Sequence, residues 1–322
     1  MLAWIRFLAQ EDTLKASLSV PPGTAFVWPD AHVILPYRRP PGTMFATHRG
    51  VRFAWWINDL RRSWMVDART CSDGGFRLDR LANGWRVGRF AVLEAIGVVH
   101  LVTTRQGPDV QQVRHDPGSA GREIARVLGV EDAAFLEQVH GGDVLVCEQG
   151  GLAGFADGLV TATESLALLG KSGDCPIVLI GDRRGRAVGF AHASWRATVA
   201  GITPAVVRRM VDLGCEPSDL VACICPSAGP CCYEVGEEVR AAAVSGIGRH
   251  AESFFRLGPT GKPHFDLGRA NANALIRAGV PSPSVHTSGV CTLCHNDLFP
   301  SHRREGDAAG RFAAVIALPS NR

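Results

Sequence analysis

Three residues that are far apart in the chain are the strongest candidates for chemistry. His140 lies in QVHGGDV, Cys175 in SGDCPIVLI and His192 in AHASWR, with separations of 35 and 17 residues. Two imidazoles and one thiolate suit a borderline-soft cation such as Zn²⁺, and three protein ligands leave a fourth position for water or substrate. These separations match no short zinc motif, and a buried cysteine often acts only as a small hydrophobic residue. The residues alone leave both a mononuclear metal site and a purely structural role open.

Other residues suggest anion binding and proton transfer. Asp174 directly precedes Cys175 and is the candidate proton carrier, with a structural turn or an outer role beside the metal as the alternative. Arginine presents a planar fork of donors that fits phosphate oxygens, although any one arginine can equally be a surface residue. The candidate phosphate-binding residues are Arg105, Arg196, Arg303 and Arg304.

The ten cysteines allow more than one interpretation. Cys291-Thr-Leu-Cys294-His295 matches the c-type haem attachment pattern, but MLAWIRFLAQ is too short and too interrupted for a signal peptide, so we do not expect haem. We expect a cytoplasmic protein, in which cysteines serve as thiols or metal ligands rather than as a disulfide framework. A second, structural zinc site and a set of buried thiols are the two possibilities for Cys223, Cys225, Cys231, Cys232, Cys291 and Cys294.

The first quarter of the chain differs from the rest. Residues 1–89 carry thirteen Arg or Lys against seven Asp or Glu and contain six of the seven Trp, whereas residues 90–322 carry 21 basic and 24 acidic residues. Short apolar stretches in residues 1–89 are interrupted by Pro and Gly without a sustained period. We therefore expect a poorly ordered or accessory extension. Its mixture of basic and aromatic residues is only a weak indication of nucleic-acid binding.

Residues 90–322 have the pattern of a single α/β domain in which mixed β-sheets are flanked by helices. Apolar or β-branched runs such as LVTATESLALLG, CPIVLIGD, AVGFAHAS and RFAAVIAL, bounded by Gly and Asp, predict buried strands. REIARVLGV and TPAVVRRMVDLG predict helices, the second with Pro204 in its first turn and Gly214 after its end. EDAAFLE, before His140, also has helical spacing. No apolar run is long enough to span a membrane.

Several motifs occur in the order seen in the laccase-domain family. QVHGGDV, ADGLVT, SGDCPIVL, AHASWR, PCCYEVGEEV and CT…LFPSHRREG…GR resemble this polyphenol-oxidase-like family, whose members are regarded as purine nucleoside phosphorylases, over roughly residues 95–322. The resemblance implies that His140, Cys175 and His192 bind zinc, with copper as the alternative, and that Arg105 lies near the pocket. It also implies phosphorolysis of adenosine, inosine or guanosine, with adenosine deamination and methylthioadenosine phosphorolysis as further activities.

The chain departs from the family pattern at several positions. Ser194 and Ala197 replace two glycines of AHAGWRG, His302 replaces a tyrosine, and TTRQGP replaces the TTRxGG entry. These changes leave the three expected metal ligands intact but affect loops expected to contact substrate.

Three alternative functions remain open at this stage. A copper-dependent polyphenol oxidase is one, although a multicopper site needs many His ligands and this chain has 11 His and no His-x-His pair. A non-enzymatic zinc-binding interaction protein is the second. A cysteine hydrolase using Cys175 as nucleophile is the third, and bound metal would argue against it.

Overall fold

The computed structural model describes residues 43–48, 51–56, 73–111 and 117–320. The chain forms two compact units, Met1–Ala68 and Arg69–Arg322. In the first unit, β1 (Thr43–His48) pairs antiparallel with β2 (Val51–Trp56). The second unit contains all the motifs noted above and is described below.

A seven-stranded mixed sheet forms one layer of the second unit. Its strands pair antiparallel, except that β6 is parallel to both β10 and β8. Across the sheet, the order is β3 (Phe76–Arg80), β4 (Arg86–Phe90), β5 (Val99–Thr103), β17 (Phe312–Ala317), β10 (Leu166–Ser172), β6 (Asp132–Glu137) and β8 (Gly151–Phe155).

A six-stranded mixed sheet forms a second layer. Its central strands are antiparallel, and each edge strand is parallel to its neighbour. Across this sheet, the order is β16 (Val285–Thr287), β13 (Leu220–Ile224), β11 (Ile177–Asp182), β12 (Val188–His192), β9 (Gly158–Thr161) and β7 (Val144–Val146). A separate hairpin consists of β14 (Phe255–Leu257) and β15 (Pro263–Phe265).

The two sheets pack face to face through alternating side chains. On β11, Ile177 and Leu179 enter the cluster between the sheets, whereas Val178 and Ile180 enter a cluster on the opposite face. Strand side chains alternate between faces, so a central strand covered on both sides must be apolar at every position. All six residues of β11 are buried, which explains the continuous apolar run CPIVLIGD.

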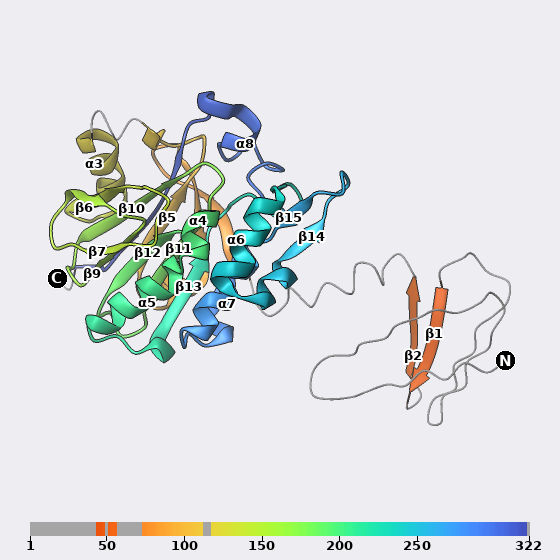
Figure 1. Cartoon of the computed structure of the whole chain (residues 1–322). Coiled ribbons are helices and arrows are strands. Elements are labelled where there is room, and N and C mark those ends of the chain that lie inside the picture. The colour runs from red at the N-terminus through yellow and green to blue at the C-terminus, as the bar shows by residue number, and fades with distance from the viewer. Residues whose placement is uncertain (1–42, 49–50, 57–72, 112–116, 321–322) are drawn as a thin grey trace, which may run out of the picture. The chain divides into compact units, whose positions relative to one another are not determined.

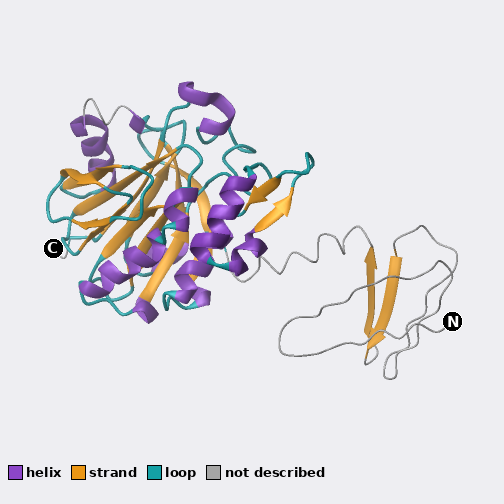
Figure 2. Ribbon diagram, viewed as in Figure 1, coloured by secondary structure: helices purple, strands orange, loops and turns teal. Residues whose placement is uncertain are grey.

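Helices cover the outer faces of the sheets (Figures 1 and 2). Val206 and Met210 of α5 and Leu275 of α7 pack on the six-stranded sheet, whereas Ile124 of α3 packs on the seven-stranded sheet. The α-helices of the second unit are α2 (Ala91–Ala95), α3 (Pro117–Leu128), α4 (Trp195–Val199), α5 (Ile202–Asp212), α6 (Glu237–Ile247), α7 (Leu267–Arg277) and α8 (His302–Glu305). The 3₁₀ helices are η3 (Pro217–Asp219), η4 (Arg249–Phe254), η5 (Ser282–Ser284) and η6 (Gly306–Ala308).

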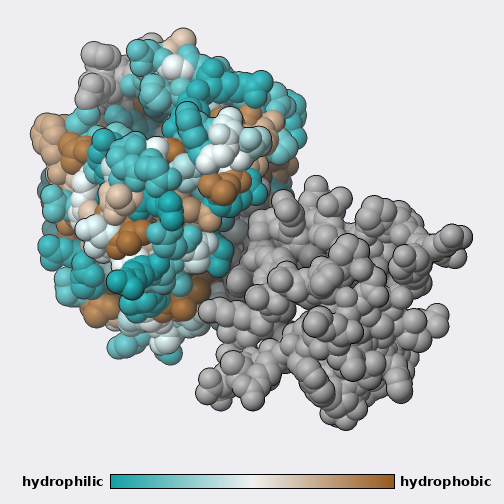
Figure 3. Space-filling model, turned by 45° about the vertical axis from the view of Figure 1, so that its right-hand side comes forward, coloured by the Kyte–Doolittle hydropathy of each residue, from teal (hydrophilic) through white to brown (hydrophobic). Residues whose placement is uncertain are grey.

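The surface agrees with this arrangement of the core. In the view of Figure 3, the described residues are mostly hydrophilic, and hydrophobic residues form small, separate patches. Within the described part of the chain, every helix is too short or too polar to cross a membrane.

The predicted fold class is confirmed, since mixed sheets are flanked by helices. The helices expected at REIARVLGV and TPAVVRRMVDLG are α3 and α5, and Gly214 has a positive φ of 88° after the end of α5. The helical interpretation of EDAAFLE is wrong, because this segment forms β6. Ala133, Ala134, Phe135 and Leu136 are buried there, and pairing on both edges overrides the local helical spacing.

The structure also differs from the predicted boundary after residue 89. Contacts place Arg69 at the start of the second unit, and β3 and β4 extend its seven-stranded sheet. Residues 1–42, on which much of the predicted extension falls, lie outside the described residues. The Arg-rich composition hid the strands because Arg77, Arg80, Arg86 and Arg89 lie on a partly exposed edge.

Candidate metal centre and adjoining cavity

The structure brings His140, Cys175 and His192 together. One ligand atom from each lies within 4.8 Å of the others, and the two imidazole ring centroids are 5.0 Å apart. His192 is the last residue of β12, Cys175 lies between β10 and β11, and His140 follows β6. The three residues therefore meet where the ends of both sheets come together, and each sheet contributes to their placement.

Asp157 connects two of these residues. Its side chain is fully buried, and its Oδ1 accepts a hydrogen bond from Nδ1 of His192 at 2.7 Å. Its Oδ2 accepts hydrogen bonds from the backbone N–H groups of Val139 at 3.2 Å and Gly141 at 2.6 Å. With Nδ1 donating to Asp157, Nε2 is the ring nitrogen of His192 that could hold a metal ion. The same carboxylate fixes the loop on either side of His140.

The electrostatics of the three residues favour a thiolate. Burial alone raises the pKa of the Cys175 thiol. Hydrogen bonds with His140 and His192 outweigh this effect and bring the pKa down to about 6. Burial lowers the pKa of His192, but hydrogen bonds to Asp157 and Cys175 raise it, to about 9. A deprotonated sulfur beside two imidazoles is the form in which cysteine binds a metal ion.

Backbone strain is concentrated at this site. His140 has a φ of 63° and Asp174 a φ of 118°, and they are two of the three non-glycine residues with positive φ in the described part of the chain. Such conformations cost of order 1–3 kcal/mol each and tend to occur at functional sites. The structure therefore maintains strained backbone at one expected ligand, His140, and directly before another, Cys175.

A cavity of about 300 Å³ opens beside the three residues. Because His140, Cys175 and His192 are part of its wall, a small ligand in this cavity would lie directly beside them. Its walls are formed by Gln111, Glu137, Gln138, His140, Lys171, Ser172, Gly173, Cys175, His192, His302 and Arg311.

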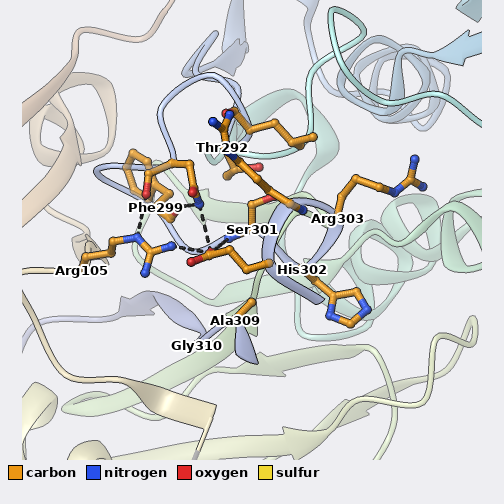
Figure 4. Close-up of polar contacts among 12 residues, drawn as sticks. Arg105, Thr292, Phe299, Ser301, His302, Arg303, Ala309 and Gly310 are labelled. Carbon is orange, nitrogen blue, oxygen red and sulfur yellow. Dashed lines mark hydrogen bonds and ion pairs between the residues drawn. The ribbon is translucent and has the colours of Figure 1, made fainter. Parts of the chain in front are cut away.

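None of the four arginines predicted from the sequence is among the residues that form the wall of this cavity. Arg105 forms an ion pair with Glu305, and its Nε donates to the carbonyl of Asn296 at 2.7 Å. Figure 4 shows Arg105 pointing toward the loop that contains Phe299 and Ser301. The side chains of His302 and Arg303 extend away from that loop. The guanidinium of Arg196 lies 4.2 Å from the ring centroid of Trp195.

Arg303 and Arg304 make contacts to neighbouring backbone. Nη1 of Arg303 donates to the carbonyl of Glu234 at 2.6 Å, and its guanidinium lies 5.1 Å from the ring centroid of Tyr233. Nη1 of Arg304 donates to the carbonyl of Leu293 at 3.0 Å. Both arginines therefore connect α8 to other loops, one that contains Glu234 and one that contains Leu293.

Asp174 is buried, and both of its carboxylate oxygens accept hydrogen bonds. Oδ1 accepts from Oγ1 of Thr292 at 2.6 Å, and Oδ2 accepts from the backbone N–H of Arg303 at 2.7 Å. Its carbonyl accepts from the N–H of Ala228 at 2.7 Å. These contacts match the structural alternative noted for this residue, since they fix the turn before Cys175 to two other loops.

Sequence reasoning did not single out three residues that the structure places here. Asp157 lies in ADGLVT and Arg311 in the final GR, so both were inside recognised motifs without an assigned role. Lys171 lies in the cavity wall, and Gln138 fixes its backbone through hydrogen bonds of 2.9 Å to its N–H and carbonyl. An acidic residue directly before the apolar run GLVT was the one signal for Asp157 that the sequence offered.

Known proteins support the family resemblance. Purine nucleoside phosphorylases from Bacteroides thetaiotaomicron and Deinococcus radiodurans are 37% and 34% identical to this chain, over 50% and 70% of its length. The alignments cover 60% of the Bacteroides protein and 90% of the Deinococcus protein. A protein from an unidentified prokaryote, adenosine deaminase RL5, is 34% identical over 58% of this chain and 76% of its own length.

Solved structures give the same result. The crystal structure of YlmD from Geobacillus stearothermophilus superimposes with a TM-score of 0.66 at 28% identity, covering 76% of this chain and 99% of that one. Residues 105–319 match the family described as "Multi-copper polyphenol oxidoreductase laccase". This match spans the strands and loops that carry His140, Cys175 and His192, and the chain belongs to this laccase-domain family.

Proposed function

We propose that this protein is a metal-dependent purine nucleoside phosphorylase that acts in the cavity beside His140, Cys175 and His192. The observation that carries the proposal is the convergence of these three side chains on one cavity whose wall also contains Lys171 and Arg311. The names of the Bacteroides and Deinococcus relatives support the same reaction.

The donor set fits a single cation. Two imidazoles and a thiolate are the ligands of a borderline-soft ion, and the hydrogen bond from His192 to Asp157 is the outer support that such ligands usually have. We therefore propose Zn²⁺, held by His140, Cys175 and His192. When bound, it supplies a Lewis acid to the open side of the site. A multicopper arrangement does not fit, because 11 His without a His-x-His pair cannot supply several copper ions.

Lys171 and Arg311 are suited to hold phosphate. Both side chains are cations in the cavity wall, and backbone carbonyls of Ala309 and Gly310 accept from Nη1 of Arg311 at 2.8 and 3.0 Å. These bonds fix the orientation of the Arg311 guanidinium, whose planar fork matches phosphate oxygens. Arg105, Arg196, Arg303 and Arg304 then act as positioning residues for the surrounding loops.

The reaction needs little covalent chemistry from the protein. A phosphate oxygen forms a bond to C1′ of the ribose while the bond from C1′ to the purine breaks, and the bonding electron pair leaves with the base. The proton of hydrogen phosphate ends on the released purine, so the products are free base and ribose 1-phosphate. Lys171 and Arg311 orient the attacking anion, and such positioning is worth several kcal/mol of the barrier.

Inosine, adenosine or guanosine with phosphate and zinc-loaded protein provides the direct test. We expect stoichiometric release of free base and ribose 1-phosphate, dependent on phosphate, with His192→Ala as the inactive control. Failure to release base from any purine nucleoside, methylthioadenosine included, would exclude the proposal. Oxygen uptake with a phenol at several copper ions per chain would instead support an oxidase, and metal binding without turnover would support an interaction protein.

The relative named adenosine deaminase supports a second activity at the same site. In that reaction, water replaces the amino group of adenosine, and inosine and ammonia are released. We expect ammonia release from adenosine in phosphate-free buffer, and its absence would restrict the site to phosphorolysis.

A further inference from the structure

A second group of metal-binding side chains lies outside the cavity. One sulfur from each of Cys231, Cys232, Cys291 and Cys294 lies within 4.8 Å of the others. We refer to these residues as the four-cysteine cluster. Cys223 and Cys225, considered with them from the sequence, are instead buried on and after β13 in the core between the sheets.

From this arrangement we propose that the four-cysteine cluster binds a second thiophilic cation of the Zn²⁺ class, independently of the cavity and of the proposed phosphorylase activity. A tetrahedral ion with Zn–S bonds of about 2.3 Å separates its sulfurs by about 3.8 Å. The sulfur of Cys294 lies 3.6 Å from that of Cys231 and 3.5 Å from that of Cys232. The four thiols are therefore already close to the spacing that such an ion requires.

Backbone groups support the sulfur of Cys291. Gly229 N–H donates to it at 3.3 Å. Backbone N–H groups of Leu293 and Cys294 also donate to this sulfur. In a Cys-x-x-Cys turn, N–H groups that point at the first sulfur stabilise the thiolate that a metal ion needs.

The space around the cluster is kept open by a glycine. A Cβ added to Gly229 would lie 3.1 Å from Cβ of Cys291, 3.2 Å from the sulfur of Cys231 and 3.4 Å from the sulfur of Cys291. The first two of these distances are tighter than ordinary van der Waals contact. The chain therefore approaches the sulfurs as closely as a residue without a side chain permits.

Two arginines contact the backbone directly before two of the four cysteines. Nε and Nη2 of Arg256 donate to the carbonyl of Pro230 at 2.9 and 2.5 Å, directly before Cys231. Arg304 contacts the carbonyl of Leu293, directly before Cys294. These positive charges partly offset the net negative charge of four thiolates around a divalent cation.

Accessibility and ligand type suggest a structural ion. Cys231 and Cys294 are exposed, so an ion can enter, and four sulfurs complete a tetrahedral site without an open position. The ion would fasten together two loops about sixty residues apart in the chain. One loop continues into Tyr233, beneath Arg303, and the other contains Thr292, which donates to Asp174.

Metal content of the native full-length chain, purified without chelator under reducing conditions, tests the proposal. We expect two zinc ions per chain in the native protein and one in the double variant Cys231→Ser, Cys294→Ser. His192→Ala should also retain one ion, which separates this site from the cavity. Cys147→Ser, which removes a buried thiol elsewhere, is the matched control and should retain two. One ion in the native chain with no change in the double variant would overturn the proposal.

Thiol reactivity gives a second test, which keeps all four cysteines of the cluster in place. Exposed Cys231 and Cys294 should react with a thiol reagent in apoprotein, and added Zn²⁺ should protect them. Gly229→Ala should weaken this protection although every sulfur remains. Unchanged reactivity on adding Zn²⁺, or a disulfide within the cluster in protein isolated under reducing conditions, would show that the cysteines do not form a metal site.

Discussion

The two cysteine-containing clusters of this molecule differ in ways that indicate different roles. The cavity cluster combines two imidazoles with one thiol, draws on both sheets and uses the buried carboxylate of Asp157 for support. The four-cysteine cluster has only sulfur ligands, comes from two loops and is supported by backbone N–H groups. Three ligands beside a cavity leave a position for substrate, whereas four ligands complete a structural site. The number of ligands and the groups that support them, rather than the presence of cysteine, distinguish a catalytic metal site from a structural one.

The largest expected effect separates the two clusters directly. His192→Ala should abolish the cavity ion and reduce phosphorolysis by about a thousandfold or more, because a Lewis acid contributes several kcal/mol and each 1.4 kcal/mol is a factor of ten. Paired measurements of metal content and of kcat/KM for inosine check this. Loss of both ions from the variant would mean that the clusters are coupled and that the comparison fails.

Asp157→Asn should have the next largest effect. The amide retains the shape of the carboxylate but not its charge, so the hydrogen bond from Nδ1 of His192 weakens and the loop around His140 loses its anchor. Loss of such outer support commonly reduces metal affinity by about 10- to 100-fold. Competition with a metal chelator measures this affinity.

Asp132→Asn is the matched control for that experiment. Asp132 begins β6 and is exposed. The change should leave the affinity of the cavity ion unaltered. Equal affinities of Asp157→Asn and the native chain would show that His192 is oriented without the carboxylate.

Replacing the two basic residues of the cavity wall should weaken phosphate binding more than metal binding. Lys171→Met and Arg311→Met should each raise the KM for phosphate by about 10- to 100-fold, since hydrogen bonds to charged groups contribute about 1.5–3 kcal/mol. The metal content should stay unchanged. Arg208→Ala, on the exposed face of α5, provides the control for loss of one positive charge.

A KM for phosphate that is unchanged in both Lys171→Met and Arg311→Met would place the anion elsewhere. The arginines predicted from the sequence would then again be the best candidates. Steady-state kinetics at varied phosphate concentration distinguishes these outcomes.

Candidate site residues and buried strands could be predicted from the sequence more reliably than contacts between segments far apart in the chain. Buried strands such as β11 were recognisable because both of their faces are apolar. His140, Cys175 and His192 were identified through their motifs, and their proximity depends on two sheets that no local pattern specifies. Asp157 received no role because its partner, His192, is 35 residues away. β6 was misread because its strand character comes from its neighbours, β10 and β8.

The smallest expected effect concerns Arg105, which the sequence favoured as a phosphate ligand. In the structure its guanidinium forms a partly exposed ion pair with Glu305 and contacts the carbonyl of Asn296. Exposed pairs of this kind contribute about 0–1 kcal/mol. Arg105→Ala should therefore raise the KM for phosphate by less than about fivefold, through the position of the loop that leads to His302. A rise as large as that expected for Arg311→Met would instead mean that Arg105 turns into the cavity and binds phosphate itself, and phosphate saturation curves of the two variants measured side by side decide between a positioning and a binding role.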